Sequence, residues 1–212
     1  MVHLEPLADW CSADYLEKRV TKIDAVKNTI HFEDGGELAY DVLGVNIGSR
    51  TRGVNDIPGV FSNSLTTRPI NDLLGKIEAK EKFLLEQGIT PTIAVCGSGA
   101  AGIELSFAFK NRWSRTFKKN VKTYLLCTEN DIMRHESEAA RELTKAKLKE
   151  HDVEVVHNAR IKRVDEDQVV LQDGRKIQCN VPVWATGAEP QQVTVRSNLA
   201  VLDGYFRVND FL

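Results

Sequence analysis

The sequence predicts an α/β fold built on a parallel sheet, and three observations support this prediction. From residue 90 to residue 156, short apolar runs alternate with longer amphipathic runs, which is the pattern of parallel strands joined by right-handed helical crossovers. A glycine-rich loop directly follows the first of these apolar runs. The 212 residues are 42% hydrophobic and 27% charged, close to the averages of soluble globular proteins, so we expect a packed core rather than disorder.

Short strands and a loop are expected in the N-terminal third of the chain. After a helix end at the N-terminus, β-forming residues predict short strands at residues 15–20 and 29–32. Residues 38–47 form a mostly apolar run, which is typical of a strand covered on both faces. Glycine, proline and polar residues over 51–70 predict a loop or linker.

Helices and strands then alternate toward the C-terminus. Apolar residues at helical spacing predict a helix over residues 71–86, with Gly88 as its C-terminal cap. The alternating region should consist of a strand, a helix, a strand, a helix and a strand, at residues 92–96, 100–113, 123–127, 136–150 and 153–156. A β-meander and one more apolar strand should follow, at residues 161–164, 169–171, 175–179 and 181–185.

The glycine loop is the sharpest motif in the sequence. It has the form G-x-G-x-x-G and consists of Gly97, Ser98, Gly99, Ala100, Ala101 and Gly102. In such a loop the first glycine permits the tight turn, the second lets the backbone approach a pyrophosphate, and the third lets the helix pack against the strand. The N-terminus of the following helix adds free N–H groups and partial positive charge. We therefore expect a Rossmann-like NAD(P)-binding domain; a merely structural glycine-rich turn is the alternative.

The end of the second predicted strand departs from this fingerprint. An NAD site usually carries an acidic residue there, which binds the ribose 2′-hydroxyl. Here the strand ends on Cys127 and Thr128, with Glu129 two positions later, and these three residues are candidate cofactor contacts. Arg134 is close in sequence, although no arginine stands at the strand end to bind a 2′-phosphate. The choice between NADH and NADPH stays open, and loss of nicotinamide binding is a third alternative.

Charge and composition exclude several classes of protein. With 28 Lys+Arg and 30 Asp+Glu, the formal net charge is −2, so we expect no nucleic-acid partner. No apolar run reaches the length of a transmembrane segment, and the N-terminus does not resemble a secretory signal. We expect a cytoplasmic protein, with a mitochondrial or membrane-peripheral location left open. The four cysteines and five histidines lack metal-ligand spacing, so we expect free thiols and no metal site.

Three segments together resemble a known family: residues 40–50, residues 97–104 and residues 181–190. The chain is similar to the pyridine nucleotide–disulfide oxidoreductase superfamily of two-dinucleotide flavoproteins. It most resembles the type II NADH dehydrogenase and apoptosis-inducing-factor-like branch, and also the flavoprotein module fused to selenide, water dikinase. The resemblance implies an FAD-dependent NAD(P)H oxidoreductase, with hydride passing from NAD(P)H to FAD and electrons then passing to a small-molecule acceptor such as a quinone.

The resemblance also implies a domain division and a set of site residues. Residues 1–52 and 186–212 would be parts of an FAD-binding domain, 53–89 a linker and helix, and 90–185 the NAD(P)-binding domain. The two crossings between domains would contact flavin or nicotinamide through Ile47, Gly48, Ser49, Thr186, Gly187 and Ala188. Glu104, in the first turn of the helix after the glycine loop, has two interpretations: a charge that stabilises the helix dipole, or a catalytic carboxylate near the nicotinamide.

The chain also departs from the family pattern. It has no N-terminal G-x-G-x-x-G for FAD and no closing FAD motif, so it looks truncated at both ends. The absence of C-x-x-C argues against a thioredoxin-reductase-like member. Two further hypotheses therefore stand beside the oxidoreductase: a non-catalytic NAD(P)-binding module without FAD, and a structural protein that has lost its ligand. Unpaired strands within residues 1–60 predict self-association.

Overall fold

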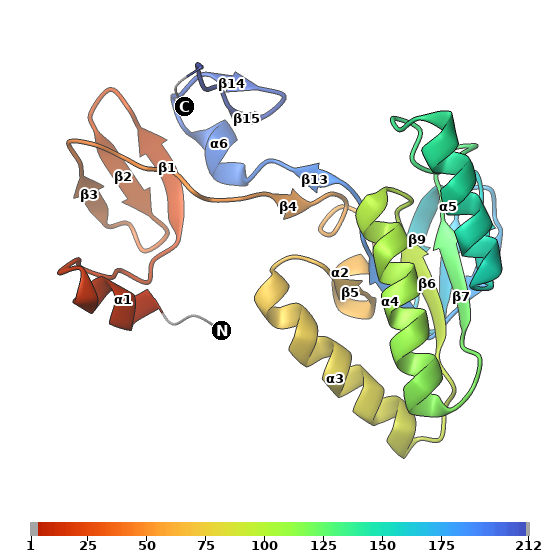
Figure 1. Cartoon of the computed structure of the whole chain (residues 1–212). Coiled ribbons are helices and arrows are strands. Elements are labelled where there is room, and N and C mark those ends of the chain that lie inside the picture. The colour runs from red at the N-terminus through yellow and green to blue at the C-terminus, as the bar shows by residue number, and fades with distance from the viewer. Residues whose placement is uncertain (1–3, 211–212) are drawn as a thin grey trace. The chain divides into compact units, whose positions relative to one another are not determined.

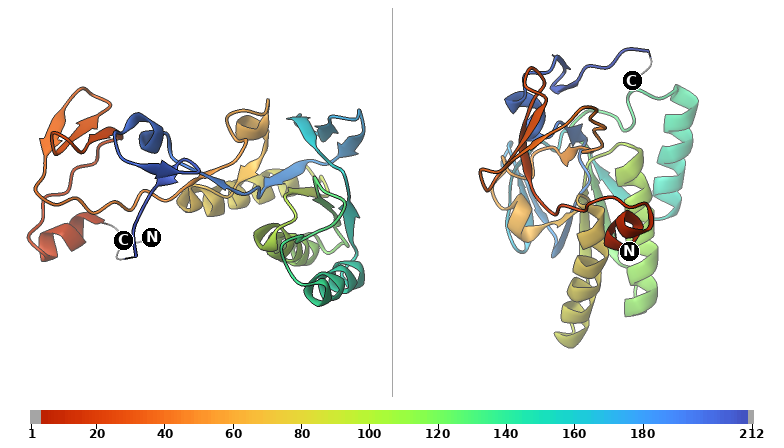
Figure 2. Two further views of the ribbon diagram at one scale, coloured as in Figure 1. Left: turned by 90° about the horizontal axis from the view of Figure 1, so that it is seen from above. Right: turned by 90° about the vertical axis from the view of Figure 1, so that its left-hand side faces the viewer.

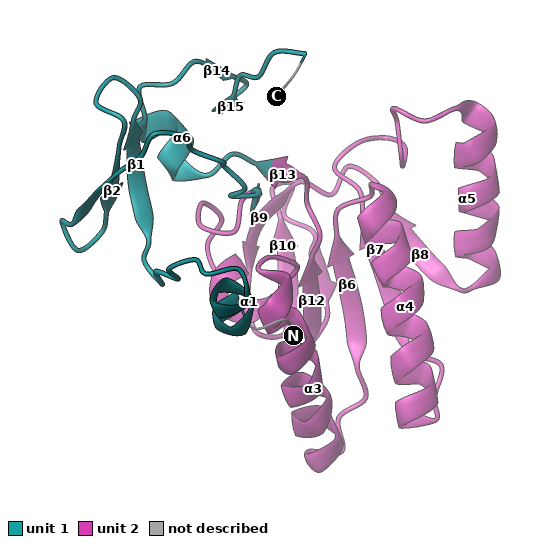
Figure 3. Ribbon diagram, turned by 60° about the vertical axis from the view of Figure 1, so that its left-hand side comes forward, with its two compact units in different colours: residues 1–50, 189–212 teal, residues 51–188 magenta. Residues whose placement is uncertain are grey.

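The computed structural model describes residues 4–210. Their contacts divide the chain into two compact units (Figure 3). Unit 1 comprises Met1–Arg50 and Glu189–Leu212, and unit 2 comprises Thr51–Ala188. The fold belongs to the α/β class, because a parallel sheet and its helices make up most of unit 2.

A five-stranded parallel sheet is the centre of unit 2 (Figure 1). Every pair of neighbouring strands in it is parallel. In spatial order its strands are β5 (Leu65–Thr66), β12 (Val181–Trp184), β6 (Thr92–Cys96), β7 (Lys122–Leu126) and β8 (Val153–Val156). Strands β6, β7 and β8 follow one another in sequence and in space, as the alternating pattern of the sequence predicts.

Four helices precede or connect strands of this sheet. They are α2 (Val60–Asn63), α3 (Ile70–Glu86), α4 (Ala100–Phe117) and α5 (Glu138–Glu150). Helix α2 comes before β5, and the other three connect successive strands. The predicted cap of α3 is present, because Gly88 adopts φ 64° and the amide of Ile89 donates to the carbonyl of Leu84 at 2.9 Å. Helix α5 begins after Ser137, whose Oγ accepts a hydrogen bond from the amide of Ala140 at 3.3 Å.

A three-stranded antiparallel meander lies between β8 and β12 in sequence. Its strands are β9 (Ile161–Val164), β10 (Gln168–Leu171) and β11 (Lys176–Gln178), in the spatial order β11-β10-β9. Figure 2 shows α4 and α5 on one side of the parallel sheet and the meander on the other. Unit 2 therefore has three layers: helices, parallel sheet and antiparallel meander.

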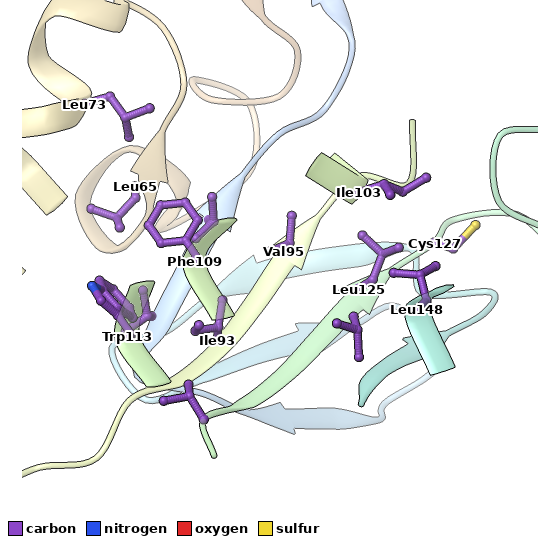
Figure 4. Packing of buried hydrophobic residues seen from close by; sticks show 14 of the residues in the cluster. Leu65, Leu73, Ile93, Val95, Ile103, Phe109, Trp113, Leu125, Cys127 and Leu148 are labelled. Atoms are coloured by element: carbon purple, nitrogen blue, oxygen red, sulfur yellow. The ribbon is translucent and has the colours of Figure 1, made fainter. Parts of the chain in front are cut away.

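The alternation of side chains along β6 builds a core on each side of the sheet. Ile93 and Val95 pack with residues of α3, α4 and α5, including Phe109 and Trp113 (Figure 4). Ala94 and Cys96 face the other way and pack against the meander. Because both faces of the sheet are covered, its strands read as continuous apolar runs in the sequence.

Unit 1 is smaller. It contains α1 (Leu4–Trp10), the antiparallel sheet β1 (Val20–Asp24), β2 (Thr29–Phe32) and β3 (Glu37–Ala39), helix α6 (Gln192–Arg196), and the hairpin β14 (Val201–Leu202) and β15 (Tyr205–Phe206). The two halves of the unit are joined after α6, where the amide of Ile23 donates to Ser197 Oγ at 2.8 Å and that of Ala25 to Asn198 Oδ1 at 2.7 Å.

The chain passes between the units twice, at β4 (Arg50–Thr51) and at β13 (Ala188–Glu189). These two short strands pair with each other. An ion pair supports them, because Arg50 Nη2 lies 2.9 Å from Glu189 Oε1 and both side chains are partly buried. The crossings therefore form a defined two-stranded ribbon.

Three N-terminal expectations differ from the structure. The strand expected at residues 15–20 begins at Val20 instead, where pairing with β2 starts. The apolar run at 38–47 is paired only as far as Ala39, and the Val42 side chain is 91% exposed, because apolar character alone does not supply a neighbouring layer to cover it. The stretch expected as a loop, 51–70, contains α2 and β5; β5 is only two residues long, too short to show a strand pattern.

Candidate nucleotide-binding site

The glycine loop lies at the carboxyl edge of the parallel sheet, between the ends of β7 and β12. The amide of Gly97 donates to the carbonyl of Leu126 at 3.1 Å, and the amide of Ala185 donates to the carbonyl of Cys96 at 2.9 Å. A Cβ at Gly97 would lie 2.5 Å from the carbonyl oxygen of Ala185, and Gly97 has φ 124°. A residue with a side chain is therefore excluded at the start of the loop by both sterics and backbone conformation.

The other two glycines of the motif have different surroundings. A Cβ at Gly102 would lie 1.8 Å from the carbonyl oxygen of Gly97, so the close packing of α4 on the loop requires glycine there. Gly99 has φ −78° and ψ 178°, which any residue can adopt, and none of the described residues comes within 4 Å of its would-be Cβ. Neither the backbone nor the packing of residues 4–210 requires a glycine at this position, and the space beside it is open.

Helix α4 begins directly at this open space. Gly99 is its N-cap residue and has no side chain to bond the first amides. Ala100 and Ala101, in the first turn, are exposed. The first amides of the helix and the positive end of its dipole are therefore accessible to an anion, as a dinucleotide pyrophosphate requires.

Cys127 follows β7 directly and is hydrogen-bonded to the loop. Ser98 Oγ donates to Cys127 Sγ at 2.9 Å, and this sulfur donates to the carbonyl of Asp131 at 3.2 Å. The Cys127 side chain is completely buried, whereas Thr128 and Glu129 are exposed. Of the three candidate contacts at this strand end, the last two have side chains accessible to a ligand.

Carboxylates beyond the end of β7 are paired with cations. Glu129 Oε1 lies 3.3 Å from Arg134 Nη1, and both side chains are about half exposed. Asp131 contacts Lys145 Nζ at 2.8 Å and Arg141 Nη1 at 3.6 Å. The hydrogen bond from Lys145 lowers the pKa of Asp131 below its usual value, so this carboxylate is charged at neutral pH. The loop after β7 is thus held to α5 by ion pairs.

The second crossing is held beside the glycine loop by the backbone of Arg52. The carbonyl oxygen of Arg52 accepts two hydrogen bonds, from Trp184 Nε1 at 2.8 Å and from Thr186 Oγ1 at 2.6 Å. Its amide donates to the carbonyl of Gly187 at 2.9 Å. Because Trp184 is buried and cannot shift freely, these bonds determine the position of the segment 185–187.

The structure brings some of the sequence-predicted site residues together. Within unit 2, the glycine loop, Cys127 and Thr186 meet at one edge of the sheet. Glu104 is exposed on α4, two residues after Gly102. The expectation that it lies in the first turn is wrong, because α4 begins at Ala100 and its first turn contains no acidic residue. Ile47, Gly48 and Ser49 belong to unit 1, where the carbonyl of Ile47 accepts a hydrogen bond from Gln191 at 3.2 Å and Gly48 has φ 60°.

Sequence reasoning did not identify two supporting interactions, the Ser98–Cys127 hydrogen bond and the carbonyl of Arg52. The first joins residues 29 positions apart, and the second joins residues 132 and 134 positions apart. Nothing local in the sequence signals such pairs, because they depend on which strand ends meet at the edge of the sheet. In the sequence, Ser98 is expected only as part of the cofactor-binding loop, and Trp184 has no assigned role.

Comparison with known proteins identifies the family. The family model described as pyridine nucleotide-disulphide oxidoreductase matches residues 12–212. The chain belongs to this family. The resemblance stated from the three sequence segments is therefore confirmed, as is the Rossmann-like fold of the nucleotide-binding unit.

Curated relatives and solved structures agree with this family. The chain is 23% identical over 176 residues to the NADH dehydrogenase-like protein YutJ of Bacillus subtilis (strain 168), covering 82% of this chain and 46% of that protein. It is 25% identical over 231 residues to a probable NADH dehydrogenase of Dictyostelium discoideum, covering 93% and 50%. NDH2 from Plasmodium falciparum in complex with NADH superposes with TM-score 0.72 at 19% identity, covering 87% of this chain and 43% of NDH2.

A ferredoxin reductase from Rhodopseudomonas palustris has a similar fold, with TM-score 0.76 at 15% identity, covering 96% of this chain and 48% of that one. The chain therefore spans about half the length of the curated relatives it matches. Among residues 4–210, no helix has the length and apolar character needed to cross a bilayer.

Proposed function

We propose that the whole protein is an FAD-dependent NAD(P)H oxidoreductase, and that unit 2 of this chain binds the NAD(P)H. The observation that carries the proposal is the glycine loop at the carboxyl edge of the sheet, where the fold requires Gly97 and Gly102 while Gly99 borders open space at the N-terminus of α4. In this role the loop backbone and the first amides of α4 bind the pyrophosphate. Thr128 and Glu129 would contact the adenosine ribose. The hydrogen bond from Ser98 to Cys127 would hold this strand end against the loop.

The crossings would hold the reacting rings. Thr186, Gly187 and Ala188 from the second crossing, and Ile47, Gly48 and Ser49 from the first, would contact nicotinamide or flavin. When bound, the cofactors would supply the bond chemistry, which is hydride transfer from NAD(P)H to flavin followed by transfer of two electrons to a small acceptor such as a quinone. Glu104 would act as a carboxylate near the nicotinamide. Buried free thiols at Cys96, Cys127 and Cys179 favour a reducing compartment such as the cytoplasm.

Substitution Gly99→Ala tests the nucleotide site. The backbone of Gly99 suits alanine and its surroundings are open, so thermal stability should be unchanged. The added methyl would occupy the space proposed for the pyrophosphate and should weaken NADH binding by about tenfold or more in isothermal titration. Gly75→Ala, in the middle of α3 with equally open surroundings, is the matched control and should bind NADH normally. Equal NADH affinity of the native chain and the Gly99→Ala variant would refute the proposed site.

A second candidate function, an NAD(P)-binding module without flavin, is favoured by a specific observation. The chain contains a single G-x-G-x-x-G loop, which serves one dinucleotide. The visible absorption spectrum of the purified chain distinguishes the two. A bound oxidised-flavin band that NADH bleaches supports the oxidoreductase for this chain, whereas a colourless protein that binds NADH supports the module.

A further inference from the structure

The end of β7 is where a dinucleotide-binding domain distinguishes its two coenzymes. NADH carries a free 2′-hydroxyl on the adenosine ribose, and NADPH carries a phosphate there. A carboxylate at the strand end accepts a hydrogen bond from the hydroxyl and repels the phosphate, whereas an arginine favours the phosphate. The side chains at this position therefore determine which coenzyme is preferred.

In this chain the residue at the strand-end position is Cys127, which has a thiol in place of a carboxylate. Cys127 is completely buried, its sulfur accepts a hydrogen bond from Ser98 at 2.9 Å, and it donates to the carbonyl of Asp131 at 3.2 Å. With both bonds made inside the protein, the thiol offers a ribose neither a free acceptor nor a charge. The Ser98–Cys127 pair thus closes the position from which the 2′-hydroxyl would be recognised.

The carboxylates that follow Cys127 in the sequence are already paired with cations. Asp131 is bound by Lys145 at 2.8 Å and by Arg141 at 3.6 Å. Glu129 is paired with Arg134 at 3.3 Å, and the side chains are 52% and 56% exposed, so this pair is held loosely and can rearrange. A 2′-phosphate would meet no unpaired carboxylate among these residues, and Arg134 could turn from Glu129 toward it.

We infer that this nucleotide site does not discriminate against NADPH, and that the Glu129–Arg134 pair determines the balance between the two coenzymes. The inference rests on the proposed NAD(P)H site. With NADH, Glu129 is the exposed carboxylate that meets the ribose hydroxyls. With NADPH, Arg134 releases Glu129 and binds the 2′-phosphate. Each coenzyme therefore contacts one member of the pair, and at most the Glu129–Arg134 ion pair is lost, so neither coenzyme gains a large advantage in affinity.

Isothermal titration of the full chain with NADH and with NADPH tests the inference directly. We expect dissociation constants within about threefold of each other, because a full charge contact changes affinity about tenfold or more. NADPH binding that is weaker by about tenfold or more, with NADH bound normally, would overturn the inference and leave the proposed function intact. Binding of neither coenzyme would overturn the proposed function itself.

Two surface variants then test whether the Glu129–Arg134 pair determines the ratio of the NADH and NADPH affinities. Glu129→Gln frees Arg134 and should shift the affinity ratio toward NADPH by about three- to tenfold, and Arg134→Met should shift it toward NADH by a similar factor. An unchanged ratio in both variants would overturn the role of the pair. Both side chains are exposed, so neither change should prevent folding.

The strand-end position is tested by Cys127→Asp, which restores a carboxylate and should favour NADH by about tenfold or more. The exposed Cys11→Asp is the matched control and should leave the ratio unchanged. Because the first substitution places a carboxylate where the native chain has a buried thiol, circular dichroism must first show that the variant is folded. If it is not, the two surface variants still decide the inference.

Discussion

Each glycine of the loop at residues 97–102 meets a different physical requirement. Gly97 is needed for its left-handed backbone and for the close approach of Ala185, and Gly102 for the contact of α4 with the loop. Gly99 satisfies neither condition and borders the open N-terminus of α4, where the proposed pyrophosphate would lie. The motif assigns a separate role to each glycine by its position, and the atoms around each one show which two are required by the fold.

Thiol reactivity is a prediction at the scale of single residues. Cys11 is exposed, and the other three of the four cysteines are buried. Burial raises the pKa of Cys179 to about 12 and that of Cys96 well above its usual value, so both remain unreactive thiols at pH 8. Ellman's reagent should therefore react rapidly with one thiol of the native chain and with all four in denaturant.

Cys11→Ser should abolish the rapid reaction of the native chain. Rapid labelling of two or more thiols in the native protein would mean that the core of unit 2 opens readily. The same measurement therefore reports how readily the buried core around β6 and β7 becomes accessible to solvent.

The elements of unit 2 are joined by a few buried or bidentate contacts in addition to the two cores. Lys110 on α4 is buried, and its ammonium donates to the carbonyls of Val121 at 2.9 Å and Asp152 at 3.0 Å, which joins the helix to the chain before β7 and before β8. Arg112, two residues on, makes a bidentate contact with Glu81 of α3 at 2.8 and 3.3 Å. These two residues connect α4 to neighbours on either side.

The contact between α3 and α4 predicts a pH-dependent contribution to stability. The hydrogen bond from Arg112 lowers the pKa of Glu81, so its stabilisation is present above the ordinary glutamate pKa of about 4.3 and is lost as the pH falls through the lower folded value. We expect Glu81→Gln to reduce the free energy of unfolding by about 0.5 kcal/mol at pH 7, since Arg112 is partly exposed. Urea unfolding followed by circular dichroism would measure this.

The penalty should shrink as the pH falls through the lowered pKa of Glu81, and it should disappear once the native glutamate is also protonated. Glu86→Gln on the same helix is the matched control, because the Glu86 carboxylate lies 3.8 Å from Lys82 and is well exposed. A penalty that stays constant as the pH is lowered from 7 into the range where Glu81 is protonated would show that Glu81 acts through packing and not through its charge.

On the scale of the whole molecule, the two units differ in how well they bury their apolar side chains. Unit 2 covers both faces of its sheet. Unit 1 leaves large apolar side chains exposed, including Trp10 at 86% and Val42 at 91%, and every residue of β3 is exposed. Exposed apolar surfaces of this kind are typical of sites that contact other protein.

Self-association through residues 1–60 follows from this surface. We predict that sedimentation velocity will show concentration-dependent association of the chain, driven by burial of these side chains. Val42→Lys should weaken it by placing a charge in the contact. Leu143→Lys, at an exposed position of α5 in unit 2, should have no effect. A chain that sediments as a monomer at all concentrations would contradict the prediction.

Much of unit 2 was predictable because its signals are local. The strand at 92–96, the glycine loop and the helix that follows it each have a pattern contained within a few neighbouring residues, and the structure has them as β6, Gly97–Gly102 and α4. The cap at Gly88 was predictable for the same reason. The family resemblance likewise depended on short contiguous segments, and the family match confirms it.

Tertiary structure alone decided the remaining features. The sequence determined that this chain has a parallel α/β unit with a dinucleotide-type loop, because strand length, helical period and glycine spacing depend only on residues close together in the sequence. It did not determine that Cys127 is enclosed by Ser98, that Trp184 and Thr186 share the carbonyl of Arg52, or that the run 38–47 is uncovered. Those depend on which distant segments meet, and contacts between distant segments exist only once the chain has folded.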